Sequence, residues 1–312
     1  MAFTAQDVKE LREKTGVGMM DCKKALTESG GDMEKAVAFL REHGLAAAQK
    51  KSGRITAEGV AYATVIDGIG VVVEVNAETD FVAKNDKFND FVTGVAEAVA
   101  KNAPSNIDAL MASNYPGSDK TITEEQQEMV LVIGENISVR RFKLYADGLN
   151  IPYVHAGGKI GVIVNLDVSG ISDTNAVLEL GKDIAMQIAA MHPLYLDTAS
   201  VDAGELEREK EIQLNKAIEE NKAKNLPDEK ARQIAENMVK GRINKYYEDI
   251  CLMNQPFVKE NKVTVEKHVE RIAKSLGGEI KVIAFTRFEK GEGIEKKQDD
   301  FAAEVAGMVD NK

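Results

Sequence analysis

A repeated order of structural elements constrains the fold of this chain more than any other feature of its sequence. IGVVVEVN at residues 69–76 and IGVIVNLD at residues 160–167 match by residue class in six of eight positions. Each is the second arm of a hairpin turned on glycines, and a helical pattern follows each. Further along, IGENISVRRFKLY at residues 133–145 and LGGEIKVIAFTRF at residues 276–288 both run from a helix end through glycine into a strand. We predict an α+β fold with two related core subdomains, in which helices cover small antiparallel sheets.

Residues 1–54 have the pattern of three short helices that precede the first hairpin. Thr4 begins a cap-like sequence at the start of the first helix, and Asp32 caps the third. The apolar residues of the third helix recur at helical spacing and form one stripe. EHG at residues 42–44 predicts the end of this helix, and residues 46–59 read as a linker.

The first core subdomain contains at least two further helices. One apolar face of the first helix carries Phe88, Phe91, Val92, Val95 and Val99. Residues 103–121 read as an irregular insertion. TEEQ at residues 123–126 predicts a capping box that starts the second helix, and Gly134 ends that helix.

Residues 203–249 are rich in charged residues and helix formers, and their apolar residues recur only thinly. NLPDE at residues 225–229 interrupts this pattern. We predict a protruding antiparallel helical hairpin, and two ordinary solvated surface helices fit the same pattern. Near the end of the chain, a short helix with Phe301 and Val305 on its apolar face predicts docking on this protein or on a partner.

These patterns divide the chain into five regions that also differ in charge. They are an N-terminal three-helix module at 1–54, core subdomain N at 55–147, core subdomain C at 148–190 and 250–288, the helical hairpin at 191–249, and a C-terminal module at 289–312. The first region has a net charge of +2, and the remainder has −13. A net charge of −11 disfavours broad nucleic-acid binding, because phosphate backbones attract Lys and Arg. The distribution suits protein partners.

The sequence gives no sign of a membrane protein or a secreted disulfide-rich protein. Its apolar runs fall short of the ~18 residues that a membrane span needs. The first ten residues lack the apolar stretch of a secretory signal, and we expect a cytoplasmic protein. Cys22 and Cys251 lie far apart and outside any CxxC spacing, so we interpret them as two buried reduced thiols.

A search for catalytic and cofactor-binding motifs finds none that is complete. GGKIG at residues 157–161 lacks the spacing of a phosphate-binding loop. The four histidines lack HxxxH spacing and do not neighbour a Cys pair, so we predict no metal and no cofactor. His155 is unusual because it lies in a glycine-rich turn, where a solvated side chain is the simplest interpretation.

EVNAETDFVAKND at residues 74–86 is open to three interpretations. Asp80 with Glu78 could form a general acid–base pair, because neighbouring carboxylates separate their pKa values. Alternatively, Thr79 or Asp80 caps the next helix while Phe81 packs in the core. In the third interpretation, a rigid strand-to-helix corner presents Phe81 as an exposed binding residue. Composition alone does not separate these three.

Three passages taken together resemble one protein family. LREKTGVGMMDCKKALTESGGDMEKAVAFLR at residues 11–41 is similar to the N-terminal module of elongation factor Ts, a module related to ubiquitin-associated three-helix domains. ETDFVAKN at residues 78–85 resembles the central motif of that family. NQPF at residues 254–257 and RFEKGEGIEKKQDDFAAEVA at residues 287–306 resemble its later motifs. The resemblance covers the chain from end to end.

The resemblance implies a non-enzymatic guanine nucleotide exchange factor in translation elongation. Its partner would be elongation factor Tu, in the GDP-bound and nucleotide-free forms. The residues Thr79, Asp80, Phe81 and Val82, which we call the corner, would dislocate the partner's Mg²⁺ and phosphate site. Phe81 would enter the partner as a wedge, with Asp80 acting on polar groups near the metal.

The resemblance also implies other contacts with the same partner. They involve Arg12, Met19, Met20, Lys23, His155, Phe301 and Val305. Direct nucleic-acid and membrane contacts are not implied. The family includes monomeric and dimeric proteins, so a homodimer remains open. Two other functions are alternatives: an enzyme that uses Glu78 and Asp80, and an adaptor whose N-terminal module binds folded proteins.

Overall fold

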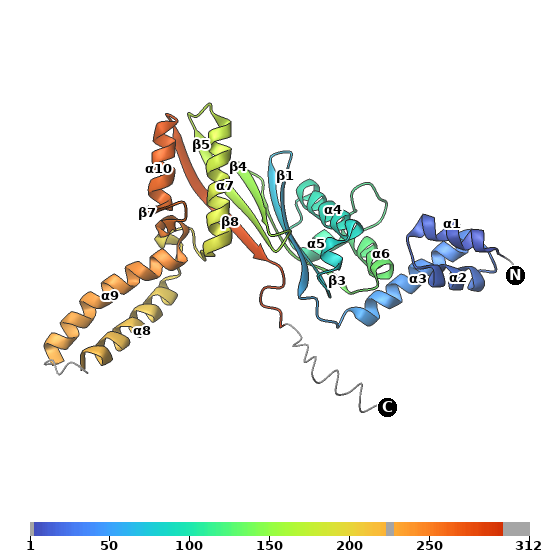
Figure 1. The fold of residues 1–312 in the computed structure, drawn as a ribbon, viewed down its shortest axis with the longest axis horizontal. Helices are drawn as coiled ribbons and strands as arrows, with labels where there is room; N and C mark the ends of the chain where they lie inside the picture. The colour runs from blue at the N-terminus through green and yellow to red at the C-terminus, as the bar shows by residue number, and fades with distance from the viewer. Residues whose placement is uncertain (1–2, 223–227, 296–312) are drawn as a thin grey trace.

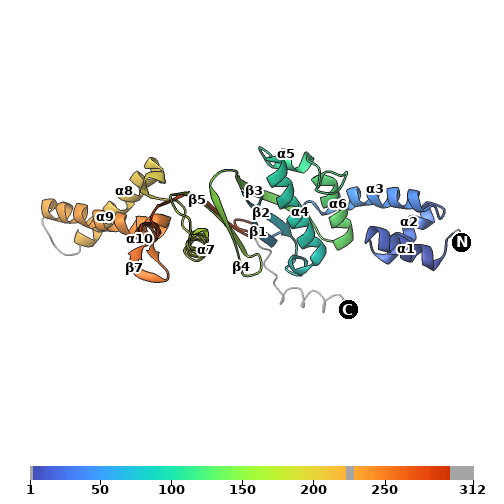
Figure 2. The same ribbon diagram turned by 90° about the horizontal axis from the view of Figure 1, so that it is seen from above.

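The computed structural model describes residues 3–222 and 228–295, and this part of the chain is elongated (Figure 1). The N-terminal module lies at one end, two three-stranded sheets lie in the middle, and a helical hairpin projects at the other end. The view turned by 90° shows the same order (Figure 2). The predicted α+β fold with two sheet-containing subdomains is therefore confirmed. Within the described residues, no helix has the length and apolar character needed to cross a membrane.

The N-terminal module consists of α1 (Ala5–Thr15), α2 (Met19–Glu28) and α3 (Met33–Lys51). The predicted caps are present. Thr4 forms a capping box with Asp7, and Asp32 accepts a hydrogen bond from the backbone N–H of Lys35 at 3.0 Å. Leu11, Cys22, Leu26 and Leu40 are among the buried side chains of the small core that these three helices share.

The prediction that α3 ends at residues 42–44, with a linker over 46–59, was wrong. The helix continues to Lys51, and the first strand begins at Glu58. Gly44 is buried against α6, where its nearest neighbours belong to Gln127 and Leu131, so packing between the two helices holds this residue in helical conformation. The alanines that follow it favour helix. This extension makes α3 a continuous connection between the module and core subdomain N.

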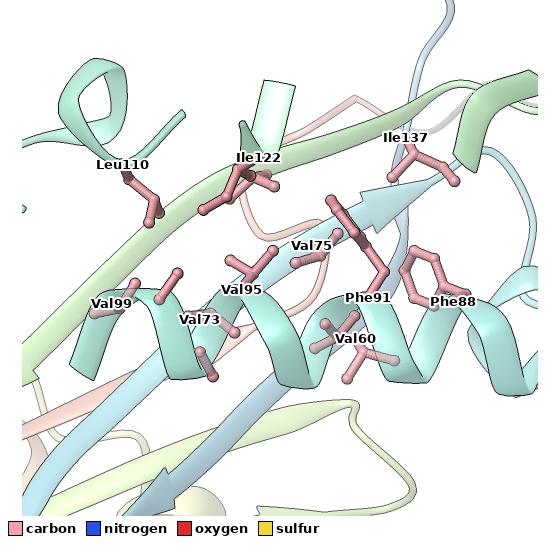
Figure 3. Close-up of a cluster of buried hydrophobic side chains, with 14 of the residues drawn as sticks. Val60, Val73, Val75, Phe88, Phe91, Val95, Val99, Leu110, Ile122 and Ile137 are labelled. Carbon is pink, nitrogen blue, oxygen red and sulfur yellow. The ribbon is translucent and has the colours of Figure 1, made fainter. Parts of the chain in front are cut away.

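Core subdomain N is a three-stranded antiparallel sheet covered by helices. The strands are β1 (Glu58–Ile66), β2 (Ile69–Ala77) and β3 (Ile137–Tyr145), in the order β1-β2-β3. The helices are α4 (Asp86–Asn102), α5 (Ile107–Ala112) and α6 (Ile122–Ile133). Figure 3 shows Phe88, Phe91, Val95 and Val99 of α4 packed against Val60 of β1 and Val73 and Val75 of β2. The predicted apolar face of α4 is the one that covers the sheet.

Two details of this subdomain differ from the predictions. The capping box of α6 begins at Thr121, whose hydroxyl accepts from the Glu124 N–H while the Glu124 carboxylate accepts from the Thr121 N–H. TEEQ at residues 123–126 therefore lies inside the helix, because Thr121 offers the same capping chemistry two residues earlier. The segment 103–121 is also less irregular than predicted, since it contains α5.

Core subdomain C repeats the architecture of core subdomain N. Its sheet has the order β4-β5-β8, built from β4 (Leu149–His155), β5 (Ile160–Ser169) and β8 (Glu279–Glu289). The helices α7 (Thr174–Met191) and α10 (Val265–Ser275) pack on it. A two-stranded ribbon of β6 (Pro256–Phe257) and β7 (Glu260–Thr264) precedes α10. In both sheets, the second arm of the hairpin is the central strand.

The predicted helical hairpin is confirmed as α8 (Ala203–Lys222) and α9 (Asp228–Ile250), which lie side by side and project from core subdomain C (Figures 1 and 2). The two sheets contact each other through a small apolar cluster of Ala63, Val72 and Ile163. This contact joins the subdomains, so elements far apart in the sequence come to lie near one another.

Candidate functional site

The corner follows the end of β2 and presents Phe81 to solvent. The Phe81 side chain is 79% exposed, whereas Val82, the next residue, is 5% exposed and belongs to the core of subdomain N. A short 3₁₀ helix over Val82–Lys84 turns the chain towards α4. The interpretation of Phe81 as a core residue was therefore wrong, because Val82 takes that place. The expectation of an exposed Phe81 is confirmed.

Hydrogen bonds from the start of β3 hold the corner in place. The Thr79 backbone N–H and hydroxyl both donate to the Glu135 carboxylate, at 2.9 and 2.7 Å. In the opposite direction, the backbone N–H of Asn136 donates to the Glu78 carboxylate at 2.6 Å. These reciprocal bonds, which we call the bracket, fix the backbone just before Phe81. Hydrogen bonds to charged groups are stronger than neutral ones.

The prediction that Thr79 or Asp80 caps the next helix was wrong. Asn85 caps α4, and its side chain accepts from the Lys87 N–H at 3.0 Å. Asp80 instead lies exposed beside Lys84, whose ammonium is 3.3 Å from the Asp80 carboxylate. The same ammonium lies 5.9 Å from the centre of the Phe81 ring. The Lys84 ammonium thus lies close to both Asp80 and Phe81.

The arrangement does not support an acid–base pair of Glu78 and Asp80. Asp80 is exposed and pairs with Lys84, while Glu78 binds Asn136 and lies 3.4 Å from Arg54. The two carboxylates therefore have separate partners. Among the described residues, no group of three or more His, Cys, Asp or Glu side chains could hold a metal ion. The corner has the features of a contact surface.

His155 is exposed as the last residue of β4, so the prediction that it lies in the glycine-rich turn was wrong: strand pairing with Ile160 extends to it, and the turn begins at the next residue. The turn between β4 and β5 lies against β1. The Tyr153 hydroxyl is 3.0 Å from Nδ1 of His155. Gly158 adopts φ +92°, and a Cβ there would lie 2.8 Å from the Val60 side chain. The carbonyl of Gly158 accepts a hydrogen bond from the Ala61 N–H at 2.8 Å. The glycine-rich sequence thus brings a turn of subdomain C onto the sheet of subdomain N.

The predicted contact residues of the N-terminal module form an exposed group. Met19 and Met20, at the start of α2, are 50% and 76% exposed. Arg12 and Lys23 are exposed as well. The module is held near the corner because the Lys51 ammonium, at the end of α3, donates to the Gly134 carbonyl at 2.7 Å. Gly134 immediately precedes the bracket residue Glu135.

Two of the predicted site residues belong to the C-terminal module, and two residues that anchor the corner were not predicted. Phe301 and Val305 lie outside the described residues. Glu135 and Asn136 anchor the corner, and no motif in the sequence predicts this role. Gly134 predicts a helix end, but the local pattern does not show that Glu135, the acid after it, binds Thr79 beside the neighbouring strand.

Comparisons with known proteins point to one family. The family model described as "Elongation factor TS" matches residues 78–292, and so begins at the bracket residue Glu78. "Elongation factor Ts" of Magnetococcus marinus is 48% identical over 311 residues, which cover 99% of each chain. "Elongation factor Ts" of Syntrophotalea carbinolica is 47% identical over 99% of this chain and 100% of its own length. "Elongation factor Ts" of a Clostridium perfringens strain is 48% identical over 98% of this chain and 99% of its own length.

Proposed function

This chain belongs to the elongation factor Ts family of translation elongation factors, and from that premise we propose that it is a non-enzymatic guanine nucleotide exchange factor. It binds elongation factor Tu in the GDP-bound form and promotes release of GDP. It then stabilises the nucleotide-free partner until GTP binds. Coupling between two ligands of one protein is reciprocal. The chain therefore lowers the partner's affinity for nucleotide by the same factor by which bound nucleotide lowers the partner's affinity for the chain.

The observation that carries this proposal is the exposure of Phe81 on a corner whose backbone is fixed. A free phenylalanine side chain that is 79% exposed contributes little to the fold. It provides apolar surface for burial on association, and the bracket limits the conformational entropy that such burial would cost. Aromatic side chains with these properties are typical of interfaces.

In the proposed mechanism, Phe81 enters the partner as the wedge, and Asp80 acts on polar or cationic groups near the partner's Mg²⁺. Thr79 and Val82, the first and last residues of the corner, fix its shape. Mg²⁺ requires near-ideal octahedral geometry, so a small displacement of its surroundings weakens its binding. Loss of Mg²⁺ contacts in turn weakens the hold of the partner on the phosphates of GDP.

Phe81 alone is insufficient for this exchange. Moving a two-state equilibrium from 1:99 to 99:1 needs about 5.5 kcal/mol of differential binding. Burial of one phenylalanine side chain contributes roughly 1.5–3 kcal/mol. We therefore assign further partner contacts to exposed residues elsewhere on the chain, namely Arg12, Met19, Met20, Lys23 and His155. We assign the same role to Phe301 and Val305 in the C-terminal module.

In this proposal the chain needs no cofactor, contacts neither nucleic acid nor membrane directly, and acts in the cytoplasm where its partner works. The test is release of fluorescently labelled GDP from purified elongation factor Tu. Addition of this protein at about one-hundredth of the partner concentration is expected to accelerate release with multiple turnovers. An unchanged release rate would contradict the proposal.

A further inference from the structure

The two sheets carry β-bulges at equivalent positions, and the side chains at these bulges differ. In the first sheet, the bulge lies between Glu74 and Val75 on β2 and makes Arg140 the extra residue on β3. In the second sheet, it lies between Asn165 and Leu166 and makes Ile283 the extra residue on β8. Glu74 and Asn165 occupy the same place in the repeated segments.

The bulge in the first sheet directs two consecutive arginines towards Glu74. Neighbouring residues of a regular strand point to opposite faces, and a bulge changes this direction locally. Nη1 of Arg140 lies 2.9 Å from the Glu74 carboxylate, and Nε of Arg141 lies 2.5 Å from it. Glu74 itself has no exposed surface. A buried carboxylate of this kind requires charged and hydrogen-bonding partners.

The same three side chains hold the turn that directly follows β8, the last strand of core subdomain C. The Gly291 N–H donates to the Glu74 carboxylate at 2.8 Å. Arg140 donates to the Glu292 carbonyl at 2.6 Å, and Arg141 lies 3.0 Å from the Glu292 carboxylate. Gly291 adopts φ +70°, and a side chain there would clash with the Ala57 carbonyl. We call this group of five residues the latch: Glu74, Arg140, Arg141, Gly291 and Glu292.

The latch is connected to the turn that follows His155, which we call the His155 turn. Just before the latch, the Lys290 N–H donates to the Lys159 carbonyl at 3.0 Å. The Lys159 ammonium also lies 3.7 Å from the Glu289 carboxylate. Lys159 belongs to the β4–β5 turn, while Glu74 lies on the strand that leads to Phe81. The latch therefore links the two exposed elements assigned to partner binding.

We propose that the latch fixes the spacing between the Phe81 corner and the His155 turn, with Glu74 as the positioning residue. This inference rests on the proposed exchange function. The repeat indicates that the latch is not needed to form such a sheet. The second sheet builds the same bulge with Asn165, Ile283 and Ala284 in the equivalent places.

A Glu74→Gln variant tests the spacing directly in the free protein. It keeps the shape of the side chain and removes the charge that pairs with both arginines. Spin labels on Asp86→Cys and Val154→Cys, which are exposed sites beside the two elements, report their separation. The distance distribution is expected to broaden in Glu74→Gln. Glu260→Gln is the control, because it breaks the exposed ion pair with Arg271, at 2.6 Å, in core subdomain C.

GDP release connects the spacing to function. The maximal rate is expected to fall about tenfold in Glu74→Gln, because small misplacements of interacting groups are costly. In the wild-type background, Phe81→Ala and His155→Ala are expected to affect the rate non-additively. In the Glu74→Gln background, their effects should become additive. A purely structural role of Glu74 would not remove this coupling.

The outcomes separate the two proposals. If wild-type protein fails to accelerate GDP release, the proposed function is wrong, whatever the spin labels report. If it accelerates release but Glu74→Gln keeps a narrow distance distribution or a wild-type maximal rate, the latch inference is wrong. Should Glu74→Gln fail to fold, Gly291→Ala disrupts the latch from the opposite side. It is then expected to give the same broadening and the same loss of rate, and a narrow distribution or a wild-type rate in that variant overturns the inference.

Discussion

Thr79 and Glu135 lie 56 positions apart in the chain and are joined by two hydrogen bonds. The Thr79 N–H donates at 2.9 Å and its hydroxyl at 2.7 Å, each to a different oxygen of the Glu135 carboxylate. Glu135 directly follows the glycine that ends α6, so a helix end and a strand start both fix its position. The exposed Phe81 is therefore attached to a backbone that is held from the start of the neighbouring strand, β3.

Thr79→Val tests the hydroxyl half of this contact. The substitution preserves the shape of the side chain but removes one bond to a carboxylate. We expect the free energy of unfolding to fall by about 1.5 kcal/mol, because the lost hydrogen bond is to a charged group, and GDP release to slow about tenfold. Urea unfolding and labelled-GDP release measure the two effects. Thr93→Val is the control, because the Thr93 hydroxyl donates to the Asn89 carbonyl within α4, away from the bracket. Equal exchange rates in the two variants would argue against the bracket.

Phe81→Ala is expected to slow GDP release without lowering stability, whereas Phe88→Ala is expected to lower stability. Phe81 is 79% exposed, so its removal should leave stability unchanged and slow GDP release by roughly tenfold to a hundredfold. Phe88 is fully buried on the face of α4 that covers the sheet (Figure 3), so its truncation should lower the free energy of unfolding by about 3–5 kcal/mol. Thermal unfolding and exchange assays on both variants provide the comparison. The wedge role is wrong if Phe81→Ala exchanges at the wild-type rate.

The repeat and the element order were predictable because they depend on local patterns. Hairpins turned on glycine, the apolar face of α4 and the charged helices of the hairpin all follow from spacing along the chain. The end of α3 was not predictable in this way. Gly44 normally favours a helix end, but here it lies against α6, and this packing partner is distant in sequence.

The chemistry of the corner was predictable only in part. Exposure of Phe81 depends on Val82 taking the core position, and either residue satisfies the apolar pattern. The bracket and the latch depend on residues brought together by strand pairing and by a bulge. Register at a bulge shifts by one residue, which a pattern of alternating residues does not reveal.

Met20→Ala tests the N-terminal module as a binding surface. Met20 is 76% exposed at the start of α2. If it contributes equally to binding before and during GDP release, its loss should raise the concentration for half-maximal exchange about tenfold. The maximal rate should stay unchanged. Leu45→Ala, a truncation of an exposed side chain on α3 of the same module, should change neither value. A lower maximal rate in Met20→Ala would instead place the module in the release step.

The base of the helical hairpin is organised around Glu205. Its carboxylate accepts hydrogen bonds from the Tyr195 hydroxyl at 2.5 Å and the Tyr246 hydroxyl at 2.9 Å. The bond to Glu205 raises the pKa of Tyr195. Burial, together with the bond to Glu205, raises the pKa of Tyr246 to about 12. The same two bonds lower the pKa of Glu205. Tyr195 lies in the segment between α7 and α8, and Tyr246 lies on α9, so the Glu205 carboxylate on α8 joins this segment to both helices of the hairpin.

Glu205→Gln is therefore expected to change the tyrosine titration of the folded protein. Between pH 10 and about 12, the folded wild-type chain retains tyrosine protons that the unfolded chain has lost, so its free energy of unfolding falls as pH rises. Without the carboxylate, Tyr195 should ionise closer to pH 10, and Tyr246 should ionise earlier than in the wild type but remain shifted by burial. The fall in stability should then be shallower.

Absorbance at 295 nm and urea unfolding across this range measure both effects. Glu207→Gln, which removes an exposed ion pair with Lys210 on the same helix, should keep the wild-type tyrosine absorbance curve. If Glu205→Gln and Glu207→Gln give the same curve, Glu205 does not hold the two tyrosines in solution.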